Sequence, residues 1–239
     1  MTPELNVYTN FLDKDIAVVY INRENKANSY NQEMLNQLLN ELQKLNSNKD
    51  IRSIIVTGVG DKNFCAGADL EEMKSKRAED GIYLLSREVF NQLNKSPKFT
   101  IAAINGKAFG GGFELALSCD LRVSKVNSSF CFPESTFDLL PSAGGIKRLP
   151  SFVSRGLAFE MIFFNKLLTA EEAFNAGLVS YSGDNYWEKT LEYCHKVRNT
   201  SSLTLSLAKI SLNHSYSNLE TDYEALIQGI LYERKYFSK

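Results

Sequence analysis

The chain of 239 residues contains little cysteine, histidine or tryptophan, and it has no long apolar run. No stretch reaches the roughly twenty apolar residues that a membrane-spanning helix needs, so no membrane association is expected. The amino-terminal residues carry acids early and do not resemble a signal or transit peptide. The cysteines form no CxxC pair, which argues against a zinc ribbon or a thioredoxin-like site; they are Cys65, Cys119, Cys131 and Cys194. We therefore expect buried free thiols in a cytoplasmic protein.

The chain also lacks an excess of charge of either sign. Its formal net charge is -1, from 27 basic and 28 acidic residues that are interspersed along the sequence. Nucleic-acid binding is not expected, because it needs a basic patch or stripe. The two histidines, His195 and His214, have no second ligand at metal-binding spacing, so no metal site is expected.

Several widespread catalytic and nucleotide-binding motifs are missing. The glycine triplet of the chain has neither G-x-G-x-x-G spacing nor a following GK[ST], so Rossmann and P-loop phosphate sites do not fit. No G-x-S-x-G elbow is present, which argues against a Ser-His-Asp hydrolase.

What the chain does contain is an alternation of short apolar runs and segments with helical periodicity. Strands are predicted at Ile16–Ile21, Ser53–Thr57 and Thr100–Ile104. Helices with one apolar face are predicted at about Gln32–Leu45 and Ile82–Leu93. This alternation predicts an α/β fold in which both helices pack on a sheet.

Beyond about Pro150 the strand signals nearly vanish and helical patterns remain. Helices are predicted at about 153–164, 170–176, 186–198, 203–212 and 219–232. The last of these has a full apolar stripe, which the protein's own core or a partner subunit would have to cover.

The most informative stretch is IAAINGKAFGGGFELALSCDLRVS, Ile101–Ser124. A predicted buried strand leads into the triplet Gly110–Gly112 and then into a helical segment from Phe113. Consecutive glycines ahead of a helix let a ligand approach backbone N–H groups, and the helix dipole favours negative charge there. This pattern fits an oxyanion hole, and it equally fits a turn that packs a helix tightly against a strand.

Two further stretches carry related features. In NFCAGADLEEM, Asn63–Met73, small residues at a strand-to-helix corner expose backbone amides, or Asp69 simply caps the following helix. In FCFPESTFDLLPSAGG, Phe130–Gly145, Glu134 has apolar sequence neighbours and lies 20 residues after Glu114. Carboxylates in apolar company are costly unless paired or protonated, so the two glutamates suggest a shared site. Either one alone would more often be a cap or a surface acid.

Together the three segments resemble the enoyl-CoA hydratase/isomerase (crotonase) superfamily in order and spacing, from about Ile16 to Glu233. INRENKANSYNQEML is similar to the family's first CoA-contacting loop, and PESTFDLLPSAGGIKRLP and LTAEEAFNAGLVS complete the pattern. The resemblance implies a crotonase-like spiral of ββα units over residues 1–185, with the active site. It also implies a helical C-terminal oligomerisation segment over 186–239 and assembly as a homotrimer or hexamer.

The same resemblance implies roles for individual residues. The oxyanion N–H groups would be those of Ala68 and Gly111, and the acid/base carboxylates those of Glu114 and Glu134. The positions expected to line the path of CoA and the acyl chain are Lys26, Ala27, Ala66, Asp69 and Leu70. Retention of both glutamates is the hydratase pattern, which implies reversible addition of water to a 2-enoyl-CoA, with no cofactor beyond the CoA of the substrate.

Other functions remain open at this point. An isomerase, dehydratase or decarboxylase of the same superfamily would act on a branched or carrier-bound acyl thioester, and a non-catalytic acyl-CoA-binding subunit would keep the fold without turnover. Two positions depart from the family pattern. Asp138 stands where a glycine is usual, and Ser135 follows Glu134 in place of an aliphatic residue. Asp138 is either a third carboxylate near the acyl end of the site or a solvated loop acid.

Overall fold

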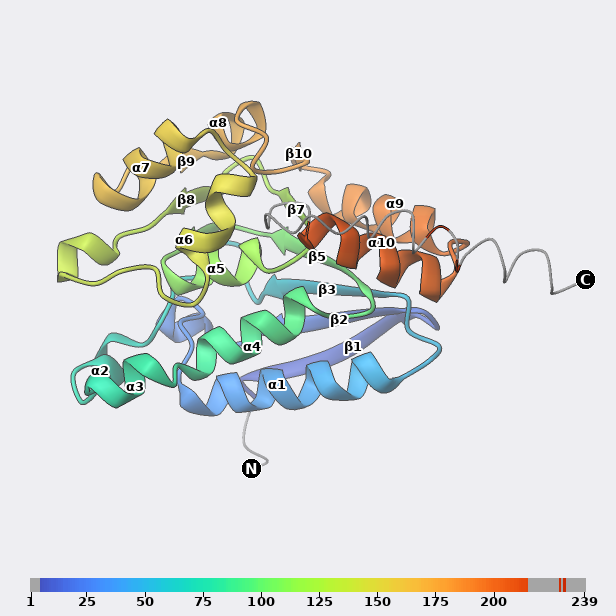
Figure 1. The fold of residues 1–239 in the computed structure, drawn as a ribbon, viewed down its shortest axis with the longest axis horizontal. Coiled ribbons are helices and arrows are strands. Elements are labelled where there is room, and N and C mark those ends of the chain that lie inside the picture. The colour runs from blue at the N-terminus through green and yellow to red at the C-terminus, as the bar shows by residue number, and fades with distance from the viewer. Residues whose placement is uncertain (1–4, 215–227, 229, 231–239) are drawn as a thin grey trace, which may run out of the picture.

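The computed structural model describes residues 5–214, 228 and 230, and its strands form two sheets (Figure 1). The strands are β1 (Val7–Asp13), β2 (Ile16–Ile21), β3 (Ser53–Gly58), β4 (Asn63–Cys65), β5 (Phe99–Ile104), β6 (Lys107–Phe109), β7 (Leu121–Ser124), β8 (Ser129–Cys131), β9 (Leu168–Thr169) and β10 (Tyr181–Ser182). The larger sheet has the order β1-β2-β3-β5-β7-β10, and the smaller has the order β4-β6-β8-β9. The pairs β1·β2 and β8·β9 are antiparallel, and the other pairs in both sheets are parallel.

Helices connect these strands. They are α1 (Gln32–Ser47), α2 (Leu70–Met73), α3 (Ala78–Ile82), α4 (Leu85–Asn94), α5 (Gly111–Leu117), α6 (Gly145–Arg148), α7 (Arg155–Phe163), α8 (Ala170–Asn175), α9 (Tyr186–Val197) and α10 (Ser202–His214), with 3₁₀ turns η1 (Glu24–Lys26), η2 (Glu134–Phe137) and η3 (Leu149–Ser151). The chain repeats a ββα pattern: β3 and β4 precede α2–α4, and β5 and β6 precede α5. In each repeat the first strand joins the larger sheet and the second joins the smaller one. The predicted α/β spiral of ββα units is therefore confirmed.

The central strands β2, β3 and β5 of the larger sheet are buried on both faces. Since successive side chains of a strand point to opposite sides, each of these strands contributes to two clusters. In β2, Ala17 and Val19 belong to the main core together with apolar residues of α1 and α4. Ile16 and Val18 face the other way, into a second cluster with Cys194 of α9. In Figure 1, α1 and α4 accordingly lie on one side of the sheet and α9 on the other.

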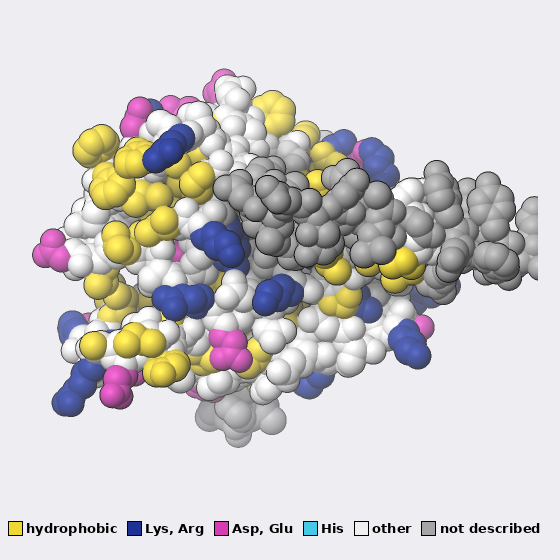
Figure 2. Space-filling view, viewed as in Figure 1, with side chains coloured by type: hydrophobic (Ala, Val, Ile, Leu, Met, Phe, Trp, Pro, Cys, Tyr) yellow, Lys and Arg dark blue, Asp and Glu magenta, His cyan; other side chains and the backbone are white. Residues whose placement is uncertain are grey.

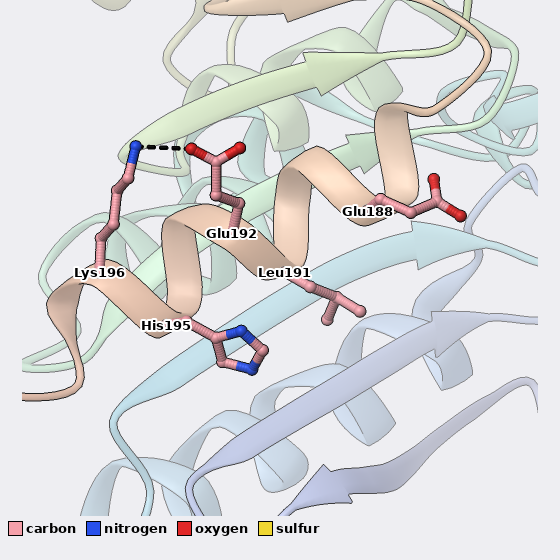
Figure 3. Close-up of a pocket in the computed structure, with 5 residues that line it drawn as sticks. All are labelled: Glu188, Leu191, Glu192, His195 and Lys196. Atoms are coloured by element: carbon pink, nitrogen blue, oxygen red, sulfur yellow. Dashed lines mark hydrogen bonds and ion pairs between the residues drawn. The ribbon is translucent and has the colours of Figure 1, made fainter.

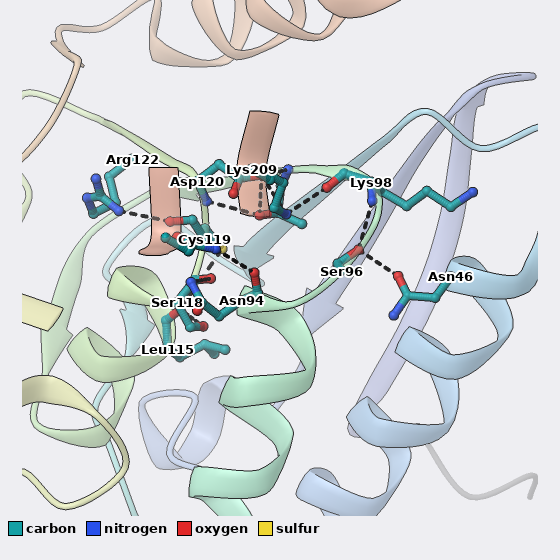
Figure 4. Close-up of polar contacts among 12 residues, drawn as sticks. Asn46, Asn94, Ser96, Lys98, Leu115, Ser118, Cys119, Asp120, Arg122 and Lys209 are labelled. Carbon is teal, nitrogen blue, oxygen red and sulfur yellow. Dashed lines mark hydrogen bonds and ion pairs between the residues drawn. The ribbon is translucent and has the colours of Figure 1, made fainter. Parts of the chain in front are cut away.

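Helix α10 is attached to the larger sheet through a buried ion pair (Figure 4). Lys209 Nζ lies 2.9 Å from Asp120 Oδ2 and donates a 2.9 Å hydrogen bond to the backbone oxygen of Lys98. Asp120 Oδ2 also accepts the Thr100 amide at 2.7 Å. Because Thr100 lies in β5, these contacts fix α10 against the strand that leads to the glycine triplet.

The predicted strands at 16–21, 53–57 and 100–104 are confirmed as β2, β3 and β5, and the helix at 32–45 is confirmed as α1. The predicted helix at 82–93 is wrong at its start, because α3 ends at Ile82 and α4 begins at Leu85. The helices predicted at 153–164, 170–176, 186–198 and 203–212 correspond to α7–α10, although the short strands β9 and β10 separate some of them. The predicted helix at 219–232 lies outside the described residues except for 228 and 230, which are helical.

The four cysteines are free and buried, as predicted. Among the described residues, no helix combines the length and apolar character required to cross a bilayer.

Candidate active site

The glycine triplet forms the start of α5. Gly110 is the residue before the helix and has a φ of 52°, in the region that glycine adopts at little cost. Its carbonyl accepts the amides of Phe113 and Glu114 at 2.9 and 3.0 Å. The helix begins at Gly111, two residues earlier than the sequence indicated, so the Gly111 amide is one of the first-turn N–H groups that have no partner within the helix.

The second backbone corner contains Ala68. The Tyr30 amide donates to the Gly67 oxygen at 2.8 Å, and the Asp69 amide donates to the Tyr30 oxygen at 2.8 Å, which forms an isolated parallel bridge. The described chain has no cis peptide bond. In a trans peptide the carbonyl of Gly67 and the N–H of Ala68 point in opposite directions. The Ala68 N–H therefore points away from the backbone of Tyr30.

The two corners are in direct contact. A Cβ atom placed on Gly67 would lie 3.1 Å from the Phe109 oxygen and 3.2 Å from the Gly111 nitrogen. The Tyr30 hydroxyl lies beside Gly111, since a Cβ atom there would be only 2.0 Å from it. Burial, followed by the charge of Glu114, holds the pKa of Tyr30 well above its usual range, so this phenol is a neutral group beside the two amides.

Glu114 is buried in the first turn of α5, and its position is fixed by hydrogen bonds. Its Oε1 accepts the amides of Ala143 and Gly145, each at 2.7 Å. Burial raises the pKa of Glu114 to about 7, although these two amides and the charges of Arg148 and Arg87 lower it. Burial thus outweighs four influences that favour the ionised form.

Glu134 begins the 3₁₀ turn η2, and its carboxyl group lies over the start of α5. A Cβ atom on Gly110 would be 2.9 Å from Glu134 Oε1. Burial raises the pKa of Glu134 to about 7; a hydrogen bond from its own amide lowers it, and the charge of Glu114 raises it further. Both glutamates therefore lie near the same helix start, and each titrates near neutrality.

The geometry can be compared with known proteins. The sequence profile described as "Enoyl-CoA hydratase/isomerase" matches residues 12–238. The chain belongs to the enoyl-CoA hydratase/isomerase family. It is 35% identical to the 2,3-dehydroadipyl-CoA hydratase of Escherichia coli over 93% of this chain and 86% of that relative. It is 34% identical to the short-chain-enoyl-CoA hydratase of Clostridium acetobutylicum over 83% of this chain and 77% of that relative. The crystal structure of an enoyl-CoA hydratase from Bacillus anthracis superimposes with a TM-score of 0.87 and 32% identity, covering 96% of this chain and 90% of that one.

In this family member, the residues expected along the path of CoA and the acyl chain form two adjacent loops. The Ala66 amide donates to the Ala27 oxygen at 3.1 Å, which joins the loop after η1 to the corner before α2. Asp69 caps α2 and forms a 2.9 Å ion pair with Arg23. Lys26 and Leu70 are exposed on the same two loops. All five predicted positions thus lie together, beside the Ala68 corner.

The apolar surroundings expected for Glu134 are only partly present. Phe132 is fully buried, whereas Phe137, Leu139 and Leu140 are exposed. Asp138 is exposed at the end of η2 with a φ of 54°, in the left-handed region. This conformation explains why a glycine is usual there, and aspartate is among the residues that tolerate it. Its exposure favours the interpretation of Asp138 as a solvated loop acid.

Sequence reasoning missed the amides of Ala143 and Gly145, which contact Glu114 from about thirty residues away. The run of small residues Ser142–Gly145 could have indicated a loop with exposed backbone amides. In the structure Gly144 has a φ of 117°, a conformation that favours glycine. Tyr30 was missed as well, because nothing in its local sequence indicates that its hydroxyl reaches Gly111.

A surface hollow lies on α9, away from the glutamates (Figure 3). It is lined by Glu188, Leu191, Glu192, His195 and Lys196, all from that helix. Helix α9 packs on β5 and β7, on the face of the sheet opposite to α1 and α4. This hollow is therefore separate from the glycine corners.

Proposed function

We propose that the protein is an enoyl-CoA hydratase, which adds water reversibly to the double bond of a 2-enoyl-CoA thioester. The observation that carries this proposal is the placement of two glutamates at the start of α5. Glu114 lies in its first turn, Glu134 Oε1 lies beside Gly110, and the pKa values of both carboxyls are raised to about 7. The family assignment and the hydratases among its relatives support the same reaction class. The chemistry requires no cofactor beyond the CoA of the substrate.

In the proposed mechanism the thioester oxygen accepts hydrogen bonds from the amides of Ala68 and Gly111. These donors stabilise the negative charge that collects on oxygen when water adds to the β-carbon. One such donor is typically worth about 3–4 kcal/mol in a transition state. The contact between the Gly67 and Gly111 corners supports a single site for both donors.

We assign the base to Glu114 and the acid to Glu134. Two amide hydrogen bonds to Oε1 favour the ionised form of Glu114 and leave Oε2 to accept a proton from water. The charge of Glu114 then favours the protonated form of Glu134. The water oxygen bonds to the β-carbon as one of its protons passes to Glu114, and the electrons of the double bond shift to give an enolate with its charge on the thioester oxygen. The carbonyl then re-forms as the α-carbon of the enolate takes the proton of Glu134. The two carboxyls exchange protonation states, and a proton transfer restores them.

The family rivals use the same scaffold. A Δ3-Δ2 isomerase can run on one base, so the retention of two glutamates at the start of α5 favours hydration over isomerisation. A dehydratase of a branched 3-hydroxyacyl thioester would use the same groups in the reverse direction. A non-catalytic acyl-CoA-binding subunit would bind the thioester without converting it.

We propose that the protein assembles as a homotrimer or hexamer, with residues 186–239 as an oligomerisation segment, and that it acts in the cytoplasm. Exposed apolar side chains support this assembly, because a second copy of the chain could cover them. Leu139 and Leu140 after η2 and Phe159, Phe163 and Phe164 in and after α7 are exposed, and η2 and α7 contact each other. Figure 2 shows exposed apolar side chains gathered at one end of the molecule. Buried free thiols fit a reducing compartment. Elution of the protein as a monomer at micromolar concentration would contradict this assembly.

The function is tested by following the loss of enoyl thioester absorbance across straight, branched and carboxylated 2-enoyl-CoAs. We expect turnover of at least one class, with the 3-hydroxyacyl product identified by mass. Conversion of 3-enoyl-CoA without hydration would identify an isomerase. Tight binding of every thioester without turnover would identify the non-catalytic subunit.

A further inference from the structure

The carboxyl group of Glu134 is poorly fixed by its own hydrogen bonds. Its Oε2 is buried and has no hydrogen-bond partner among the described residues, whereas Oε1 of Glu114 accepts two amides. The direction of the Glu134 side chain therefore depends on the short turn η2 that carries it. The residue before this turn, Pro133, provides no side-chain cap.

Asn165, in the loop between α7 and β9, contacts residues on both sides of Glu134: the backbone of Phe132 and the side chain of Ser135. Its Nδ2 donates to the Phe132 oxygen at 2.6 Å and to Ser135 Oγ at 2.7 Å. The Ser135 hydroxyl in turn donates to Asn165 Oδ1 at 3.0 Å. We propose that Asn165, with Ser135, is a positioning residue for Glu134. This inference rests on the proposed function, because it presumes that the direction of Glu134 matters for the reaction.

The residue type at this position has two separable roles. Asn165 has a φ of 52° and follows the end of α7, where the amides of Phe164 and Lys166 both donate to the Glu160 oxygen. A left-handed residue at a helix end is usually glycine and sometimes asparagine. If ending the helix were its whole role, glycine would serve as well. The side-chain amide is the part that reaches η2.

The variants separate these roles. Asn165→Gly keeps the helix end and removes the amide, and Asn165→Asp keeps the shape but removes the donor to the Phe132 oxygen. Asp138→Gly is the matched control, because it also places glycine at a left-handed position beside η2 without touching the amide contacts. A double variant of Asn165→Gly with Ser135→Ala tests whether the two side chains act as one unit.

We expect kcat for 2-enoyl-CoA hydration to fall about tenfold in Asn165→Gly and Asn165→Asp, with KM nearly unchanged. A displacement of about 1 Å in a reacting group can cost up to about 100-fold in rate. The side chain of Asn165 bonds to Phe132 and Ser135, and neither residue belongs to the loops that would bind CoA. Asp138→Gly should keep kcat within about twofold of wild type. The double variant should be no slower than Asn165→Gly alone.

A second readout does not depend on turnover. Carboxyl-¹³C glutamate labelling follows the titration of Glu134, with its resonance identified by its loss in Glu134→Gln. We expect the pKa of Glu134 to fall toward its ordinary value in Asn165→Gly, because a looser turn admits water, and to stay unchanged in Asp138→Gly. Wild-type kcat together with a wild-type Glu134 titration in Asn165→Gly would overturn the proposal. If the wild-type protein converts no thioester but the Glu134 pKa still shifts only in the Asn165 variants, the proposed function fails and the positioning role stands.

Discussion

Glu114 and Glu134 have pKa values raised to about 7 by burial, but their surroundings differ. Oε1 of Glu114 accepts two backbone amides and belongs to a side chain on an α-helix. Glu134 begins a four-residue 3₁₀ turn, and its buried Oε2 has no partner in the described part of the chain. The carboxylate of Glu114 is thus placed by hydrogen bonds to its own oxygen. The carboxyl group of Glu134 is placed by the contacts that Asn165 makes with Phe132 and Ser135, on either side of it.

The loop that supplies the amides to Glu114 is itself supported by two arginines. Arg87 Nε donates to the Ser142 oxygen at 2.8 Å, and an Arg148 guanidinium nitrogen donates to the Ala143 oxygen at 3.1 Å. Both arginines lower the pKa of Glu114. The Glu114 side is therefore both better hydrogen-bonded and closer to positive charge, which suits the carboxyl that has to be ionised before the reaction begins.

The largest expected effect is on catalysis. Glu114→Gln and Glu134→Gln should each lower kcat for hydration by about 100-fold or more, because general acid–base groups typically contribute that much. The two variants should differ in a second reaction, the exchange of α-protons of a saturated acyl-CoA in D₂O. Glu134→Gln should abolish this exchange, whereas Glu114→Gln should retain it within about tenfold.

Both glutamine variants should melt within a few degrees of wild type, since the carboxamide oxygen introduced by Glu114→Gln can still accept both amides. Hydration at near wild-type rates in either variant would contradict the mechanism that uses two carboxyls. Loss of α-proton exchange in both variants alike would contradict the division of roles between acid and base.

Much of this site was predictable from sequence because it is local. Gly111 and Glu114 lie within one helical turn, and the buried strand before them is a continuous apolar run. The strands β4, β6, β8 and β9 were not predictable, since runs of two or three residues carry no usable periodicity. The contacts that distinguish the two glutamates were not predictable either. Ala143 contacts Glu114, and Asn165 contacts the backbone beside Glu134, each from about thirty residues away. The small residues around Ala143 indicate an unusual loop, but no local pattern at either position identifies the partner.

The next effect concerns stability. A carboxyl whose folded pKa is about 7, above the ordinary 4.5, contributes stability that is complete below pH 4.5 and is lost as the pH rises through 7. Above pH 7, each ionised glutamate therefore disfavours the folded state by roughly 3 kcal/mol. Glu134→Met removes this cost, whereas Glu114→Met also leaves two buried amides unpaired, at about 1–3 kcal/mol each.

Urea unfolding at pH 8 should accordingly show Glu134→Met to be more stable than wild type by about 1–3 kcal/mol. Glu114→Met should be less stable than Glu134→Met by about 2 kcal/mol or more. The gain in Glu134→Met should shrink as the pH falls from 7 and vanish well below pH 4.5, where wild-type Glu134 is protonated in both states. Equal stability of the two methionine variants at pH 8 would show that the amides of Ala143 and Gly145 do not distinguish the two sites.

The smallest effect concerns the arginines behind Glu114. Arg148 lowers the pKa of Glu114, so Arg148→Met should raise it, and the ionised base should be lost at a higher pH. The acidic limb of the kcat/KM profile should therefore move up by less than about one pH unit, with a loss of several-fold at pH 6 and a smaller loss at pH 8. Lys147→Met is the matched control, because it removes the same charge from the neighbouring exposed position of α6 and should leave the limb in place. An equal shift in both variants would mean that net charge near α6, and not the contact between Arg148 and the Ala143 carbonyl, sets the ionisation of Glu114.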